Sequence, residues 1–142
     1  MALFVDRPEK RHAGVIRDPA GNLYGTTSLG GTGGGGVVYE LGTVLYSFTG
    51  GADGGGPNGV IRDSAGNLYG TTTYGGTGYP GWGVVYKLDT AGQETVLYSF
   101  TGGADGSKPQ AGVIRDSAGN LYGTTNGGGK YGGGVVFKLK PQ

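Results

Sequence analysis

Three aspartates at the same place in a repeated pattern are the residues of this chain best suited to acid/base chemistry. Asp18, Asp63 and Asp116 each end the string Val-Ile-Arg-Asp. A pair of carboxylates can hydrolyse a glycosidic bond, and their separation decides whether the anomeric configuration is retained or inverted. The repeated aspartates therefore predict a small glycoside hydrolase as one function. The alternative is that each aspartate caps its own hairpin turn.

Side chains that could bind sugars lie beside these aspartates and in the variable loops. Aromatic rings stack on sugar faces or anchor protein contacts, and neighbouring amides, guanidinium groups and hydroxyls can hydrogen-bond a ligand. The same tyrosines and asparagines also suit ordinary strand packing and turns. The residues expected to contact a ligand are Trp82, Tyr74, Tyr79, Arg62, Arg115, Tyr69, Tyr122, Asn67 and Asn120.

The composition excludes several other kinds of site. Cysteine is absent and His12 is the single histidine, so neither a thiolate metal site nor a repeated Ser-His-Asp triad can form. Asp53 and Asp105, in Gly-Gly-Ala-Asp-Gly, supply fewer oxygens than calcium needs. Eleven basic and ten acidic side chains nearly cancel, so the chain lacks the excess of positive charge that is typical of nucleic-acid-binding proteins. We expect no metal, no cofactor and no nucleic-acid partner.

The elements that must position these residues belong to an internal repeat. The string Gly-Val-Ile-Arg-Asp-x-Ala-Gly-Asn-Leu-Tyr-Gly-Thr-Thr begins at Gly14, Gly59 and Gly112. Each copy continues through a glycine-rich loop to Gly-Val-Val-(Tyr/Phe)-x-Leu, and two copies run on into Val-Leu-Tyr-Ser-Phe. The apolar stretch from Ala2 to Val5 matches this last string in character. The single domain, 1–142, therefore divides into units of approximately 2–41, 43–88 and 95–139, permuted by one strand.

Each unit offers four short runs of β-branched and aromatic residues with no helical period, which predicts an all-β fold. Strand alternation places Val44, Tyr46 and Phe48 on one face. Asp-Ser-Ala-Gly-Asn has the residues of a tight hairpin turn.

Four antiparallel strands per unit are typical of a β-propeller blade, and a ring usually needs about four to eight blades. Three blades are too few to close a ring. We therefore expect a homo-oligomer, with a dimer of six blades favoured. A three-fold β-trefoil-like barrel is the structural alternative.

The strings Arg-Asp-Ser-Ala-Gly-Asn-Leu-Tyr-Gly-Thr-Thr, Gly-Val-Val-Tyr-Lys-Leu and Val-Leu-Tyr-Ser-Phe-Thr-Gly-Gly-Ala-Asp-Gly resemble the GloVer-type tandem repeats of secreted bacterial choice-of-anchor proteins. The resemblance covers nearly all residues from Gly14 to Leu139. The repeat is also similar to the blades of two-component regulator propellers, with Tyr where those carry Trp. The resemblance implies a propeller-like fold and an extracellular or cell-surface setting, and it brings no catalytic residues. The apolar start of the chain is too short for a signal peptide or a membrane span.

The leading functional hypothesis is a lectin-like, non-catalytic binding module at the cell surface. Its variable loops, 28–35, 73–82 and 126–133, would bind carbohydrate, and their repetition would supply avidity. Trp82 is the strongest single candidate for ligand contact, with packing between repeats as its alternative. The hydrolase and a purely structural, self-associating repeat are the other two functions that the sequence leaves open.

Overall fold

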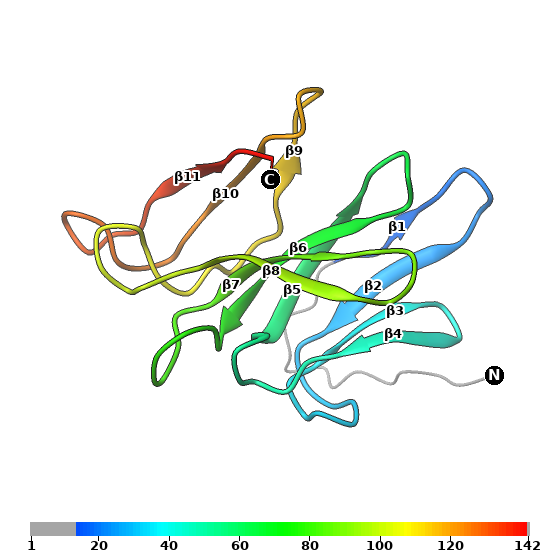
Figure 1. Cartoon of the computed structure of the whole chain (residues 1–142), viewed down its shortest axis with the longest axis horizontal. Coiled ribbons are helices and arrows are strands. Elements are labelled where there is room, and N and C mark those ends of the chain that lie inside the picture. Colours follow the sequence, from blue (N-terminus) through cyan, green and yellow to red (C-terminus); the bar gives the residue numbers. More distant parts are fainter. Residues whose placement is uncertain (1–13, 142) are drawn as a thin grey trace.

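The computed structural model describes residues 14–141 and is all-β, as the sequence predicts (Figure 1). The first sheet contains β1 (Ile16–Arg17), β2 (Leu23–Thr27), β3 (Val37–Glu40) and β4 (Thr43–Ser47). The second contains β5 (Gly55–Arg62), β6 (Leu68–Tyr74), β7 (Val84–Leu88) and β8 (Glu94–Ser99). The third contains β9 (Ile114–Arg115), β10 (Leu121–Thr124) and β11 (Val136–Leu139). Across 14–141, no helix is long and apolar enough to cross a membrane.

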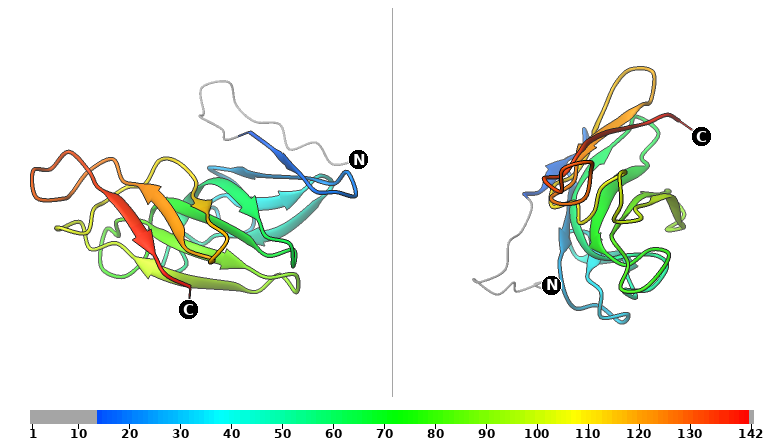
Figure 2. Two further views of the ribbon diagram at one scale, coloured as in Figure 1. Left: turned by 90° about the horizontal axis from the view of Figure 1, so that it is seen from above. Right: turned by 90° about the vertical axis from the view of Figure 1, so that its left-hand side faces the viewer.

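Each sheet is an antiparallel meander, because its strands pair in chain order. The three sheets lie in a row, with the second between the other two (Figures 1 and 2). The strands of the described range do not close into the barrel that the trefoil alternative requires. Hydrogen bonds place each Val-Leu-Tyr-Ser strand last in its sheet, whereas the sequence units of 43–88 and 95–139 begin with it. The segment from Ala2 to Val5 lies outside the described residues.

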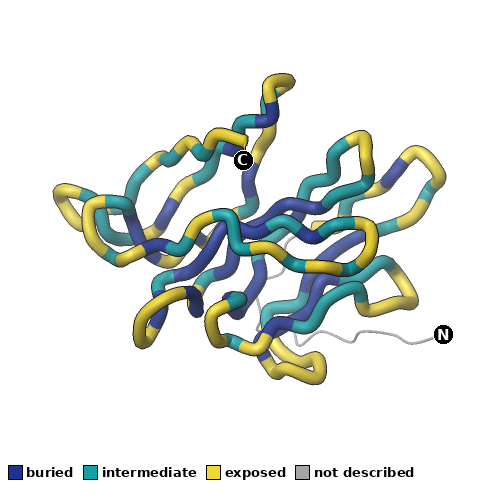
Figure 3. Tube along the Cα trace, viewed as in Figure 1, coloured by how far each residue is buried: buried dark blue, intermediate teal, exposed yellow. Residues whose placement is uncertain are grey.

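The core lies between the sheets, where buried residues of neighbouring sheets pack together. Figure 3 shows the buried segments concentrated on the strands and the exposed ones on the loops. The ring of Phe48 meets that of Tyr86 edge to face at 5.0 Å, which joins the first sheet to the second. Phe100 meets Phe137 in the same way at 5.2 Å and joins the second sheet to the third. Burial of these rings stabilises each junction by a few kcal/mol, on the order of 2 per side chain.

A glycine in the second strand of each sheet is covered by the ring opposite it on the third strand. A Cβ added to Gly70 would lie 2.7 Å from Oη and 2.9 Å from Cζ of Tyr86, its cross-strand partner. The ring therefore occupies the space that a side chain at this position would need. This explains the glycine that Leu-Tyr-Gly-Thr has in all three copies. The equivalent pairs are Gly25 with Tyr39 and Gly123 with Phe137.

A β-bulge overturns the expected alternation along β4. Val38 pairs with Tyr46 but Tyr39 pairs with Val44, so Leu45 is an additional residue opposite β3. The extra residue turns Val44 to the other face from Tyr46, since one inserted residue reverses the alternation. Tyr46 packs on the core between the first two sheets, whereas Val44 is 44% exposed. The prediction that Val44, Tyr46 and Phe48 share a face was therefore wrong.

Candidate functional site

Each repeated aspartate is the first residue of the turn that joins the first two strands of its sheet. Asp63 accepts hydrogen bonds from the backbone N–H of Asn67 at 2.9 Å, from its Nδ2 at 3.0 Å and from the Tyr69 hydroxyl at 3.0 Å. The hairpin-cap interpretation is confirmed in all three sheets. The same three donors serve Asp18 from Asn22 and Tyr24, and Asp116 from Asn120 and Tyr122.

These hydrogen bonds favour the ionised carboxylates. The side-chain amide of Asn22 lowers the pKa of Asp18 to about 2, and that of Asn120 does the same for Asp116. Burial works to raise the pKa of Asp63, but the bonds from Asn67 and Tyr69 together leave it below its ordinary value. A carboxylate that is ionised at neutral pH is a poor general acid. Catalysis by these aspartates stays a prediction.

The two arginines expected to contact a ligand lie between sheets. The Arg62 guanidinium lies over the Tyr24 ring of the first sheet, 5.9 Å from its centroid. Arg115 lies over Tyr69 of the second sheet at 5.6 Å. Such cation–π contacts add to the attraction between neighbouring sheets. Tyr122 has Lys138 of its own sheet over its ring, at 5.6 Å.

The structure divides the expected ligand-binding residues into two groups at opposite ends of the strands. Asn67 directly precedes β6 and Tyr69 is the second residue of this strand, whereas Tyr74 is the last of its seven residues. The first and last residues of such a strand lie about 20 Å apart. The hairpins therefore lie at one end of each sheet and the glycine-rich loops at the other (Figure 1).

The glycine-rich loops carry the most exposed aromatic rings of the described residues. Tyr79, in the loop between β6 and β7, is 99% exposed, and Tyr131, in the loop between β10 and β11, is 88% exposed. The sequence interpretation included Tyr79 but missed Tyr131, which is the one ring in 126–133 and could have been found by comparing the loops position by position. Both rings are therefore accessible to a ligand, although Lys130 Nζ lies over the Tyr131 ring, 5.2 Å from its centroid.

Trp82 and Tyr74 are held against backbone instead. A Cβ on Gly102 would lie 2.7 Å from the Trp82 ring, and Lys108 Nζ is 5.8 Å from the ring centroid. Tyr74 lies across the turn before β5, with Cε2 3.3 Å from a Cβ placed on Gly50. Trp82 thus has the contacts of the packing alternative, and its contact with a ligand stays a prediction.

The model of the Gloeobacter/Verrucomicrobia repeat matches residues 5–142. The chain belongs to the Gloeobacter/Verrucomicrobia repeat family. No curated protein matches it.

Membership of this repeat family agrees with the three equivalent hairpins and loops that the structure contains.

The other repeated acids, Asp53 and Asp105, also close turns. Asp105 accepts hydrogen bonds from the Thr101 N–H at 2.9 Å and from the Tyr98 hydroxyl at 2.8 Å. Asp53 accepts the same bonds from Thr49 and Tyr46. Between residues 14 and 141, no three His, Cys, Asp or Glu side chains cluster in a way that could hold a metal ion.

Glu94, at the start of β8, is a titratable group that the repeat pattern does not reveal. Its Oε1 is buried and accepts no hydrogen bond from the described residues. Burial, and then repulsion from Asp53, raises its pKa from 4.5 to about 7. Between about pH 4.5 and pH 7, the folded protein therefore favours the protonated form of Glu94, whereas the unfolded chain favours the ionised form.

The stability of the protein should consequently fall as the pH rises from about 4.5 to about 7, because the folded state binds the proton more tightly across this window. Glu94→Gln should flatten this part of the pH profile. It should also raise the free energy of unfolding near pH 8 by about 1 kcal/mol, a value reduced for the partial exposure of the side chain. Urea unfolding on both sides of the window measures the effect, and equal pH dependence in variant and wild type would contradict it.

Proposed function

We propose that this chain is a non-catalytic, lectin-like module that binds carbohydrate through its glycine-rich loops. The observation that carries the proposal is the pair of exposed rings, Tyr79 and Tyr131, in equivalent loops of neighbouring sheets. Large exposed apolar groups on a soluble surface often mark a binding site, and a tyrosine ring offers both a stacking face and a hydroxyl.

The loops that carry these rings are tied to the strands beneath them, which lowers the entropy cost of binding. The Ser99 hydroxyl accepts a bond from the Thr77 N–H at 2.8 Å, and Ser47 does the same for Gly33 at 2.9 Å in the first sheet. Backbone bonds of 2.9 and 2.8 Å join Gly76 to Gly51 and Gly129 to Gly103. Fixed loops in a row favour several shallow sites that act together.

The hydrolase alternative has less support. The three aspartates that it needs are each engaged by an asparagine and a tyrosine of their own hairpin. A retaining or inverting glycosidase needs one protonated carboxyl as well as one carboxylate. The lowered pKa values of these aspartates favour the ionised form in all three.

The proposal includes a propeller-like arrangement of the sheets and an extracellular or cell-surface location. Support for the arrangement comes from the meander order of each sheet and from the face-to-face packing of neighbouring sheets. Support for the location comes from the resemblance of the repeat to those of secreted bacterial proteins.

Replacing both exposed rings tests the binding function. Tyr79→Ala with Tyr131→Ala should weaken binding to glycans at least tenfold, because stacking on two rings is lost and each is worth on the order of 1 kcal/mol. A glycan array identifies the ligand, and calorimetry then measures its affinity for the wild type and the double variant.

Leu29→Ala is the matched control, since Leu29 is a half-exposed apolar residue of the equivalent loop in the first sheet but has no ring. It should bind like the wild type. A wild type that binds no glycan on the array, or a double variant that binds as tightly as the wild type, would reject the proposal.

A further inference from the structure

The two ends of the row of sheets present the same faces that pack together inside it. We call the face that a sheet turns toward the next sheet its forward face and the opposite one its back face. Val38 of the first sheet and Val85 of the second lie on forward faces and are 0% exposed. Their equivalent in the third sheet, Val136, is 81% exposed. The forward face of the third sheet is therefore uncovered.

The back face of the first sheet is uncovered in the same way. Val60 and Val113 lie on the back faces of the second and third sheets and are 5% and 3% exposed, whereas their equivalent Val15 is 52% exposed. Leu41 is 54% exposed and its equivalent Leu88 only 1%. The two uncovered faces are thus complementary by the same pairing that joins the sheets within the chain.

A charged contact repeats the pattern. Each internal junction places an arginine of one sheet over a tyrosine of the sheet before it, Arg62 over Tyr24 and Arg115 over Tyr69. Arg17 has the pose of Arg62, since its Nη2 lies 3.2 Å from a Cβ placed on Gly21, as that of Arg62 does from Gly66. No preceding sheet among the described residues offers Arg17 a ring. Tyr122 of the third sheet is the equivalent of Tyr24 and Tyr69, and no arginine of a following sheet lies over it among the described residues.

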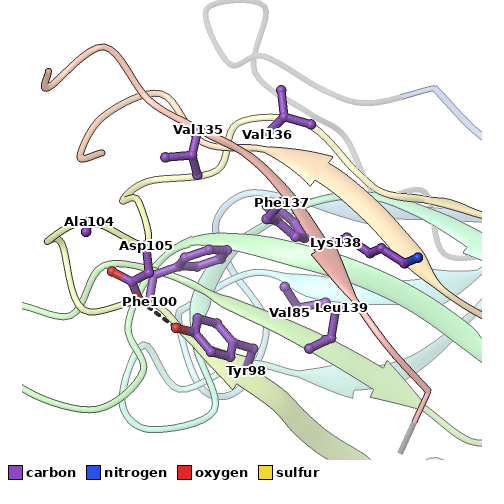
Figure 4. Close-up of a pocket in the computed structure, with 10 residues that line it drawn as sticks. All are labelled: Val85, Tyr98, Phe100, Ala104, Asp105, Val135, Val136, Phe137, Lys138 and Leu139. Atoms are coloured by element: carbon purple, nitrogen blue, oxygen red, sulfur yellow. Dashed lines mark hydrogen bonds between the residues drawn. The ribbon is translucent and has the colours of Figure 1, made fainter. Parts of the chain in front are cut away.

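The free edge of β11 adds a third observation. Among residues 14–141, β11 pairs only with β10. A pocket of about 340 Å³ lies beside β11, lined by Tyr98, Phe100 and Asp105 on one side and Phe137 and Leu139 on the other (Figure 4). Val136 points away from these two β11 side chains (Figure 4). At the junction of the first two sheets, the equivalent place is taken by the fourth strand, β8, through Val96.

We propose that a second copy of this chain docks head to tail, with the back face of its first sheet on the forward face of the third sheet. Arg17 of the second copy then lies over Tyr122, as Arg62 lies over Tyr24 and Arg115 over Tyr69 within the chain. Because the faces differ, the contact is heterologous, and using it twice closes two copies into one ring of six sheets. This proposal is independent of the carbohydrate-binding function.

Light scattering after size-exclusion chromatography tests the proposal. The wild type should have about twice the 14.3 kDa mass of the chain, and Val136→Asp should elute as a folded monomer, because it places a charge on the docking face. Tyr131→Asp, which changes an 88% exposed residue outside this face, should keep the dimer mass. A monomeric wild type, or a dimer that Val136→Asp leaves intact, would overturn the proposal. Glycan binding that persists in the Val136→Asp monomer would show that carbohydrate binding does not depend on dimer formation.

Cross-linking tests the head-to-tail orientation, and the absence of natural cysteines makes it specific. Arg17→Cys and Tyr122→Cys chains, joined by a short bis-maleimide, should cross-link when mixed and remain single when alone. Cross-linking within either variant alone would mean that like faces meet. That result, or no cross-linking in the mixture, would overturn the orientation.

Discussion

Gly83→Ala is expected to lower the free energy of unfolding by about 4 kcal/mol or more, through backbone strain and steric overlap together. Gly83 is buried at the end of the loop before β7, with φ of 95°, a conformation that an alanine rarely adopts. An added Cβ would collide with the carbonyl oxygen of Thr72 and lie 2.7 Å from Cδ of Pro109. Backbone bonds from Gly83 to Gly75 and from Phe100 to Gly83 prevent the loop from moving aside.

Urea denaturation followed by circular dichroism measures this loss, and a variant that is unfolded without urea also meets the expectation. Gly133→Ala is the control, because a Cβ there meets no atom within 4 Å and its φ is not positive. It should change stability by less than about 0.5 kcal/mol. A Gly83→Ala protein as stable as this control would show that the loop can rearrange.

Asp63→Ala is expected to cost about 3 kcal/mol of folding free energy, because three donors lose a charged acceptor at once. The Asn67 backbone N–H, its side-chain amide and the Tyr69 hydroxyl all point at this carboxylate. The Tyr69 ring is 9% exposed, so its hydroxyl has little access to water as a replacement partner. Asp63→Asn should cost less, since it keeps one acceptor oxygen.

The same urea titration, compared with Ser64→Ala, measures the contribution of the hairpin network. Ser64 is exposed in the same turn, and its side chain makes no hydrogen bond with the described residues, so this control should stay within about 0.5 kcal/mol of the wild type. An Asp63→Ala protein with control-like stability would mean that water satisfies all three donors.

The sequence predicts the parts of the fold that depend on neighbours along the chain. The hairpin at Asp63 to Asn67 and the strands around it follow from turn residues and apolar runs, and both are observed. The bulge at Leu45 was not predictable, because it depends on how β4 registers against β3 rather than on the composition of either strand. Binary alternation alone therefore assigned Val44 to the wrong face.

The burial of a residue by a neighbouring sheet could not be predicted from the sequence either. Val38, Val85 and Val136 occupy the same position in identical Gly-Val-Val strings, yet the first two are fully buried and the third is exposed. Glu94 has no acidic equivalent in the other strings and gains its raised pKa only from the burial that packing creates. Of the two exposed rings in the candidate site, the sequence analysis named Tyr79. Tyr131 was missed, because finding it needs a position-by-position comparison of the loops.

The aromatic cover over each strand glycine has a consequence for how such proteins change in evolution. The ring and the glycine that it covers lie in the same sheet, so a duplicated unit brings its own complete pair. Unequal recombination between the nearly identical stretches that begin at Gly14, Gly59 and Gly112 would add or remove a whole unit with its loop and leave every remaining pair intact. The number of loops, and with it the set of exposed side chains, can therefore change between related proteins while each sheet keeps its own glycine–ring packing.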